Sequence, residues 1–77
     1  ISPDRSISWA KLGDVFGLKG ESINAIACFS NAYRFSKNRI STHKYMINLA
    51  KNGVDELKNV RLRAIELAEK LYPELQN

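Results

Sequence analysis

The spacing of apolar residues is the feature that most constrains the fold of this chain. There is no proline between Pro3 and Pro73, and apolar residues recur three and four positions apart instead of alternating with polar ones. A spacing of three and four places side chains on one face of an α-helix, whereas alternation is typical of a half-buried strand. The pattern therefore predicts an all-α fold.

Four helices are expected, each with one apolar stripe. The expected ranges are about 7–18, 23–36, 41–51 and 54–72. Short links join these ranges, and short links between helices favour antiparallel neighbours. The sequence therefore predicts two antiparallel helical hairpins, one over residues 6–38 and one over residues 39–73.

Capping residues support these boundaries. Ser6 and Ser22 can act as N-caps, because a serine hydroxyl accepts a hydrogen bond from an unpaired backbone N–H. Gly53 is expected to end the third helix in the left-handed conformation, and Pro73 to end the fourth. The predicted core face of the fourth helix consists of residues spaced by three and four, namely Leu57, Val60, Ala64, Leu67 and Leu71.

Length and composition exclude several classes of protein. A chain of 77 residues, 44% apolar and 26% charged, is expected to be a single globular domain over residues 1–77. Its one Cys and one His provide neither an internal disulfide nor a cysteine-based zinc site. No apolar run reaches the roughly 20 residues of a membrane span, and no signal peptide is recognisable. We expect a cytoplasmic protein without a cofactor.

The first half of the chain carries a spaced motif. Residues 9–16 read W-x2-L-G-x2-F, and residues 25–29 read A-x3-F. This resembles the tetratricopeptide repeat (TPR), whose signature is W-x2-L-G-x2-Y…A-x3-F. Gly20 and Ala32 also match positions of the family, whereas Lys37 stands where the family often has Pro. The resemblance covers about residues 6–39, and the alternative is a generic four-helix bundle.

The resemblance implies how the first hairpin packs. Gly13 and Ala25 would let the two helices cross closely, and Trp9, Leu12 and Phe29 would fill the space around the crossing. The second hairpin matches the signature poorly, so it is expected to be a degenerate repeat or a capping pair. Two hairpins are fewer than the roughly three repeats of a stable array. We therefore expect either a longer parent protein or self-association. The first residue, Ile rather than Met, predicts a fragment or a processed product.

A basic stretch is the main functional signal. Residues 22–54 contain no Asp or Glu, but they contain five cations, Arg34, Lys37, Arg39, Lys44 and Lys51. A field of one sign attracts anions. The sequence therefore favours an acidic partner, although a solvated helix face explains the same pattern.

The TPR resemblance gives this signal a location. In that family the first helix of each hairpin lines a concave groove, and some repeats use Lys and Asn there to bind the C-terminal carboxylate of an acidic peptide. Lys44 and Asn48 resemble that pair, whereas Ala10 and Asp14, the equivalents in the first hairpin, do not fit such a clamp. The predicted partner-binding residues are Lys44, Asn48, Lys51, Asn52 and Asp14.

Two alternative binding functions remain open. A nucleic-acid-binding helical domain would use the basic patch of Arg34, Lys37 and Arg39 on phosphates, with aromatic side chains stacking on bases. The aromatic candidates are Tyr33, Phe35 and Tyr45. A homo-oligomerisation module would use the last helix, where Leu62, Ile65 and Ala68 lie beside the predicted core stripe. Some of these residues are expected to remain exposed, unless the strip packs deeper into the core.

Catalysis is not expected. Cys28 has apolar neighbours and is interpreted as a small buried hydrophobe, and His43 as an exposed residue near a helix start. Asp55 and Glu56 suit the positive end of a helix dipole. No paired carboxylates, phosphate-binding glycine loop or nucleophile–base pair is recognisable. The sequence predicts a non-catalytic protein–protein interaction module, an adaptor or assembly domain.

Overall fold

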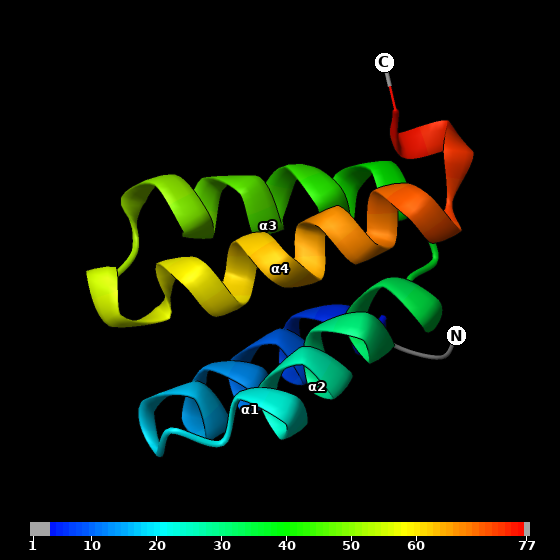
Figure 1. Cartoon of the computed structure of the whole chain (residues 1–77). Helices are drawn as coiled ribbons and strands as arrows, with labels where there is room; N and C mark the ends of the chain where they lie inside the picture. The colour runs from blue at the N-terminus through cyan, green and yellow to red at the C-terminus, as the bar shows by residue number, and fades with distance from the viewer. Residues whose placement is uncertain (1–3, 77) are drawn as a thin grey trace.

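A computed structural model describes residues 4–76 and consists of helices joined by short turns (Figure 1). The helices are α1 (Ser6–Leu18), α2 (Ser22–Arg34), α3 (Arg39–Asn52), α4 (Asp55–Leu71) and the 3-10 helix η1 (Pro73–Leu75). No strand occurs among the described residues. The prediction of an all-α fold with four helices is confirmed.

The helices form two layers. α1 packs along α2 and α3 packs along α4, each pair antiparallel (Figure 1). Between the pairs, α2 packs chiefly against α4, and α4 also reaches α1, whereas α1 and α3 touch at few points. The fourth helix therefore lies in the middle of the fold, between α3 and the first hairpin (Figure 1).

Local polar groups begin the first and third helices. Asp4 Oδ1 accepts a hydrogen bond from the Ser6 N–H at 2.8 Å, and Asn38 Oδ1 accepts one from the Ser41 N–H at 3.1 Å. The predicted N-cap at Ser6 is wrong, because Ser6 is the buried first residue of α1 and the cap position is Arg5. The predicted cap at Ser22 is also wrong, because Ser22 is the first residue of α2 and no side chain caps this helix.

Glycines permit the close helix crossings. A Cβ on Gly13 would lie 2.7 Å from Cε1 of the buried Phe29, and one on Gly17 would lie 2.6 Å from Cδ2 of Leu57. The expected close crossing at Gly13 and the burial of Phe29 are confirmed. Leu12, which was expected to fill space around the same crossing, is 41% exposed.

Gly53 differs from its expected conformation. Its φ is −86°, so it is not left-handed, and among the described residues only Gly20 has a positive φ, +80°. Gly53 is required for another reason, because a Cβ at this position would collide with the guanidinium of Arg61.

The core face of α4 is rotated from the predicted one. The buried residues of this helix are Leu57, Arg61, Ala64, Ile65 and Ala68. Leu67 and Leu71, which were expected in the core, are exposed. The physical reason is an ion pair between Arg61 and Asp14 of α1, which allows an arginine to take a core position.

Candidate functional site

A groove runs between α3 and α4. One part is a cavity of about 330 Å³ lined by Ile47, Ala50, Lys51, Lys58, Leu62, Ile65 and Glu69. The adjoining part is a wider depression of about 840 Å³ lined by His43, Ile47, Glu66, Glu69, Lys70, Leu75 and Gln76. The two parts share Ile47 and Glu69, so they form one continuous groove.

Helical spacing puts these residues on one edge of each helix. His43, Ile47 and Lys51 of α3 lie four residues apart, as do Lys58 and Leu62 of α4, so each series projects from one side. The two helices are antiparallel neighbours, and their edges line the groove together. Leu62 is 39% exposed, so the apolar floor is open to solvent.

A buried hydrogen-bonded chain supports one wall of the groove. The Tyr33 hydroxyl lies 2.8 Å from His43 Nδ1, and His43 Nε2 lies 3.1 Å from Glu69 Oε2. A carboxylate only accepts hydrogen bonds, so in the neutral ring Nε2 carries the proton and Nδ1 accepts from Tyr33. The chain joins α2, α3 and α4.

The members of this hydrogen-bonded series are engaged with one another. Burial, followed by the negative charge of Glu69, raises the pKa of the Tyr33 phenol. The Tyr33 side chain has no exposed surface, and both ring nitrogens of His43 have partners.

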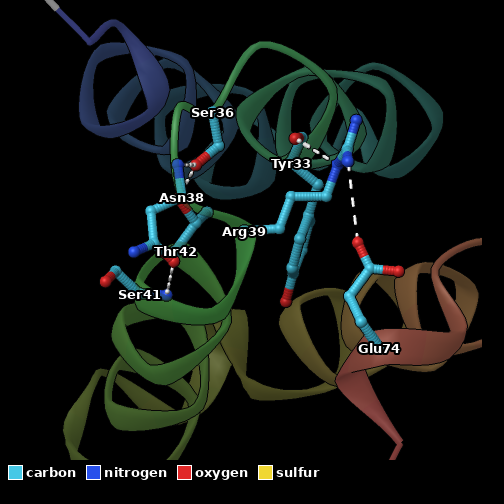
Figure 2. A network of polar contacts seen from close by, with 7 residues as sticks. All are labelled: Tyr33, Ser36, Asn38, Arg39, Ser41, Thr42 and Glu74. Atoms are coloured by element: carbon cyan, nitrogen blue, oxygen red, sulfur yellow. Dashed lines mark hydrogen bonds and ion pairs between the residues drawn. The ribbon is translucent and has the colours of Figure 1, made fainter.

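Arg39, the first residue of α3, contacts both α2 and η1 (Figure 2). Its Nε donates to the backbone oxygen of Tyr33 at 3.2 Å, and its Nη1 lies 3.6 Å from Glu74 Oε2 in η1. Its guanidinium carbon also lies 4.1 Å from the centre of the Tyr72 ring. The terminal η1 segment, which forms one end of the groove through Leu75, is held in place by these contacts.

Short polar contacts shape the turn between α2 and α3 (Figure 2). The hydroxyls of Ser36 and Thr42 lie 2.6 Å apart, and the Asn38 N–H donates to the Ser36 hydroxyl at 3.1 Å. These contacts, together with the Asn38 cap, set the direction in which α3 leaves the first hairpin.

The predicted partner-binding residues do not lie together in the structure. Lys44, Asn48, Lys51 and Asn52 are exposed on α3, and Asn48 accepts a hydrogen bond from Asn52. Of these four, Lys51 lines the groove between α3 and α4. Asp14 lies on α1, away from these four residues, and forms an ion pair with Arg61; its role toward a partner stays a prediction.

The predicted basic patch is also divided. Arg39 belongs to the internal contacts described above, whereas Arg34 is exposed, with its guanidinium carbon 5.3 Å from the centre of the Phe35 ring. Phe35 in turn stacks on Trp9 at 6.1 Å between ring centres. The backbone N–H of Lys37 donates to Asp4 Oδ2 at 3.2 Å. The Phe35 ring therefore already contacts Trp9 and Arg34 of the same chain.

The predicted self-association strip does not form one exposed surface. Leu62 is exposed, whereas Ile65 and Ala68 are buried, so of these three residues only Leu62 remains exposed. The rotation of α4 that exposes Leu67 and Leu71 turns Ile65 and Ala68 toward the core. Leu62 and Ile65 instead contribute to the groove.

Sequence reasoning missed the central members of the site. His43 was expected to be exposed, yet it is 7% exposed and bonded at both nitrogens. Its partner Glu69 lies 26 residues away. No local pattern marks that pairing, because it depends on how α3 and α4 align. The expected burial of Cys28 is confirmed.

Comparisons with protein-family models, curated proteins and solved structures find no match to this chain. Within residues 4–76, no helix has both the length and the hydropathy needed to cross a bilayer. In the same part of the chain, no three His, Cys, Asp or Glu residues are gathered so that they could hold a metal ion.

Proposed function

We propose that this domain is a non-catalytic protein-interaction module that binds an amphipathic, acidic segment of a partner in the groove between α3 and α4. The observation that carries the proposal is the groove itself, an apolar floor with two lysines at one end. Concave sites with apolar linings and a few placed charges are typical binding sites.

Shape and chemistry favour a helical occupant. The floor residues are Ile47 of α3 and Leu62 and Ile65 of α4. A groove between two neighbouring helices can accept the apolar face of a third helix. Lys51 and Lys58 form no ion pair within residues 4–76, so their charges are available to carboxylates of a partner. The absence of acids from residues 22–54 strengthens the same field.

The tetratricopeptide resemblance is a separate part of the proposal. The close approach at Gly13 and Phe29 supports a repeat-like first hairpin. The weak contact between α1 and α3 does not favour a groove lined by those two helices. We therefore place the partner on the second hairpin, and Lys44 and Asn48 beside the site rather than in it.

A titration tests the proposal. The probe is a synthetic helical peptide with Leu at positions i, i+3, i+4 and i+7 and Glu on its polar face, added to the isotope-labelled chain. We expect amide shifts clustered on Ile47, Leu62 and Ile65. A peptide of the same composition with its Leu residues dispersed is the control for charge alone.

A matched pair of variants locates the site. Leu62 is 39% exposed and lines the groove, whereas Leu67 is 38% exposed on the other side of α4. Leu62→Asp is expected to weaken binding about tenfold or more, as for a central apolar anchor, and Leu67→Asp to change it little. Equal losses in the two variants, or equal binding of both peptides, would refute the groove as the site.

A further inference from the structure

The proposed function leaves open how a partner lies in the groove, and the structure constrains this. Resting on that function, we infer that the groove orients its occupant. The acidic end of the bound segment lies toward the α3–α4 connection, and its basic end lies toward η1. The argument is the unequal distribution of charge along the groove.

One end of the groove is basic. Lys51 is in the last turn of α3 and Lys58 is in the first turns of α4, so both lie near the connection between the helices. Neither takes part in an ion pair within the described residues. Asp55 and Glu56 begin α4 but do not line the groove, and Glu69, the acid of this cavity, lies about three turns further along α4 than Lys58. The charges that line the end near the connection are therefore the two lysines.

The other end is acidic. Glu66 and Glu69 line it, with Lys70 as the cation beside them. Glu69 is partly engaged by His43, whereas Glu66 forms no ion pair within residues 4–76. This end therefore attracts a cation, although less strongly than the basic end attracts an anion.

The two ends act separately. Lys58 and Glu66 are eight positions apart, which at 1.5 Å per residue corresponds to about 12 Å along α4. This exceeds the screening length of about 8 Å at physiological ionic strength, so a charge at one end is weakly felt at the other. A matching segment would carry its acidic and basic residues two to three helical turns apart, with apolar residues between them.

Paramagnetic labelling tests the orientation directly. The probe is a helical peptide with a Leu stripe, Glu residues at one end and Lys residues at the other, carrying a nitroxide at one end or the other. The two ends of α4 are about 24 Å apart, so broadening distinguishes them. A label on the Glu end is expected to broaden the amides of Gly53 and Asp55, and a label on the Lys end those of Tyr72 and Leu75.

Exchanging the charges at the two ends of the groove should reverse the orientation of the bound peptide. In the variant K51E/K58E/E66K the pattern of broadening is expected to invert, because each end then favours the opposite charge. Lys44→Glu is the matched control, since Lys44 is an exposed lysine of α3 outside the groove, and its pattern should stay unchanged.

The outcomes separate the two claims. Binding with equal broadening from both labels, or a pattern unaffected by the charge exchange, overturns the orientation and leaves the groove as a binding site. Failure of every amphipathic peptide to bind overturns the proposed function, and the orientation with it.

Discussion

Arg61 and Asp14 connect the two hairpins through a two-pronged ion pair. Arg61 Nη2 lies 2.9 Å from Asp14 Oδ2, and Arg61 Nε donates to Asp14 Oδ1 at 3.1 Å. The arginine side chain is 5% exposed and that of the aspartate 25%. A third hydrogen bond, from Nη1 to the Leu49 backbone oxygen at 3.0 Å, satisfies another donor.

Loss of the Asp14 carboxylate is expected to destabilise the fold. Asp14→Ala leaves a buried guanidinium without its counter-charge, which costs about 3 kcal/mol of unfolding free energy. The double variant Asp14→Leu with Arg61→Leu should be more stable than Asp14→Ala, because it buries no unpaired charge. Urea unfolding followed by circular dichroism measures both. Glu66→Ala, which removes an exposed acid, is the control and should change stability little.

This ion pair also explains why the face of α4 could not be predicted. A stripe through Leu57, Ala64 and Leu67 and one through Leu57, Arg61 and Ala68 both follow helical spacing. The first is the more apolar, so the sequence alone favours it. Only the carboxylate of Asp14, 47 residues earlier in the chain, makes Arg61 tolerable in the core.

The parts that could be predicted are local. The helices follow from the spacing of apolar residues, and the stop at Pro73 from the chemistry of proline. The groove depends instead on the alignment of two helices. Lys51, Leu62 and Ile65 were identified individually, but the sequence offered no reason to place them together. The His43–Glu69 pair has the same origin and was missed.

Tyr33 should make stability depend on alkaline pH. Its pKa is raised in the folded chain by burial and by Glu69, whereas an unfolded tyrosine loses its proton near pH 10. Above that pH the folded state binds more protons than the unfolded state, so stability falls as pH rises. Tyr33→Phe should show a smaller loss of urea midpoint between about pH 9 and pH 11. Tyr45→Phe, at a half-exposed site, should keep the loss, and identical slopes in both variants would contradict the assignment.

Gly13→Ala should destabilise the first hairpin despite the better helix propensity of alanine. The substitution gains about 1 kcal/mol from propensity. It also forces a methyl group against Phe29, whose ring has no exposed surface into which to move. Overpacking of this kind costs about 1–3 kcal/mol, so the net effect is a loss. The thermal midpoint measures it, with Ser8→Ala on the exposed face of α1 as control; a higher midpoint for Gly13→Ala would contradict the close crossing.

Cys28 should react slowly in the folded chain. Burial raises the pKa of its thiol, and the side chain is 6% exposed. Since the thiolate is the reactive form, both effects lower the rate of disulfide exchange. With an aromatic disulfide reagent we expect slow modification in buffer and fast modification in denaturing urea. Fast reaction in buffer would mean that α2 does not cover this residue.

Arg39 and Arg34 should respond differently to the same substitution. Arg39 makes a hydrogen bond to Tyr33, an ion pair with Glu74 and a cation–π contact with Tyr72. Arg39→Ala should therefore cost about 1–2 kcal/mol of unfolding free energy and loosen η1. Arg34→Ala removes an exposed arginine that contacts the half-exposed Phe35, so its cost should be well below that of Arg39→Ala. Arg39→Lys should not restore the loss, because an ammonium lacks the planar fork that bonds to Tyr33 while covering a ring. Amide exchange near Leu75 reports the loosening of η1, and equal stability of the two alanine variants would contradict the structural role of Arg39.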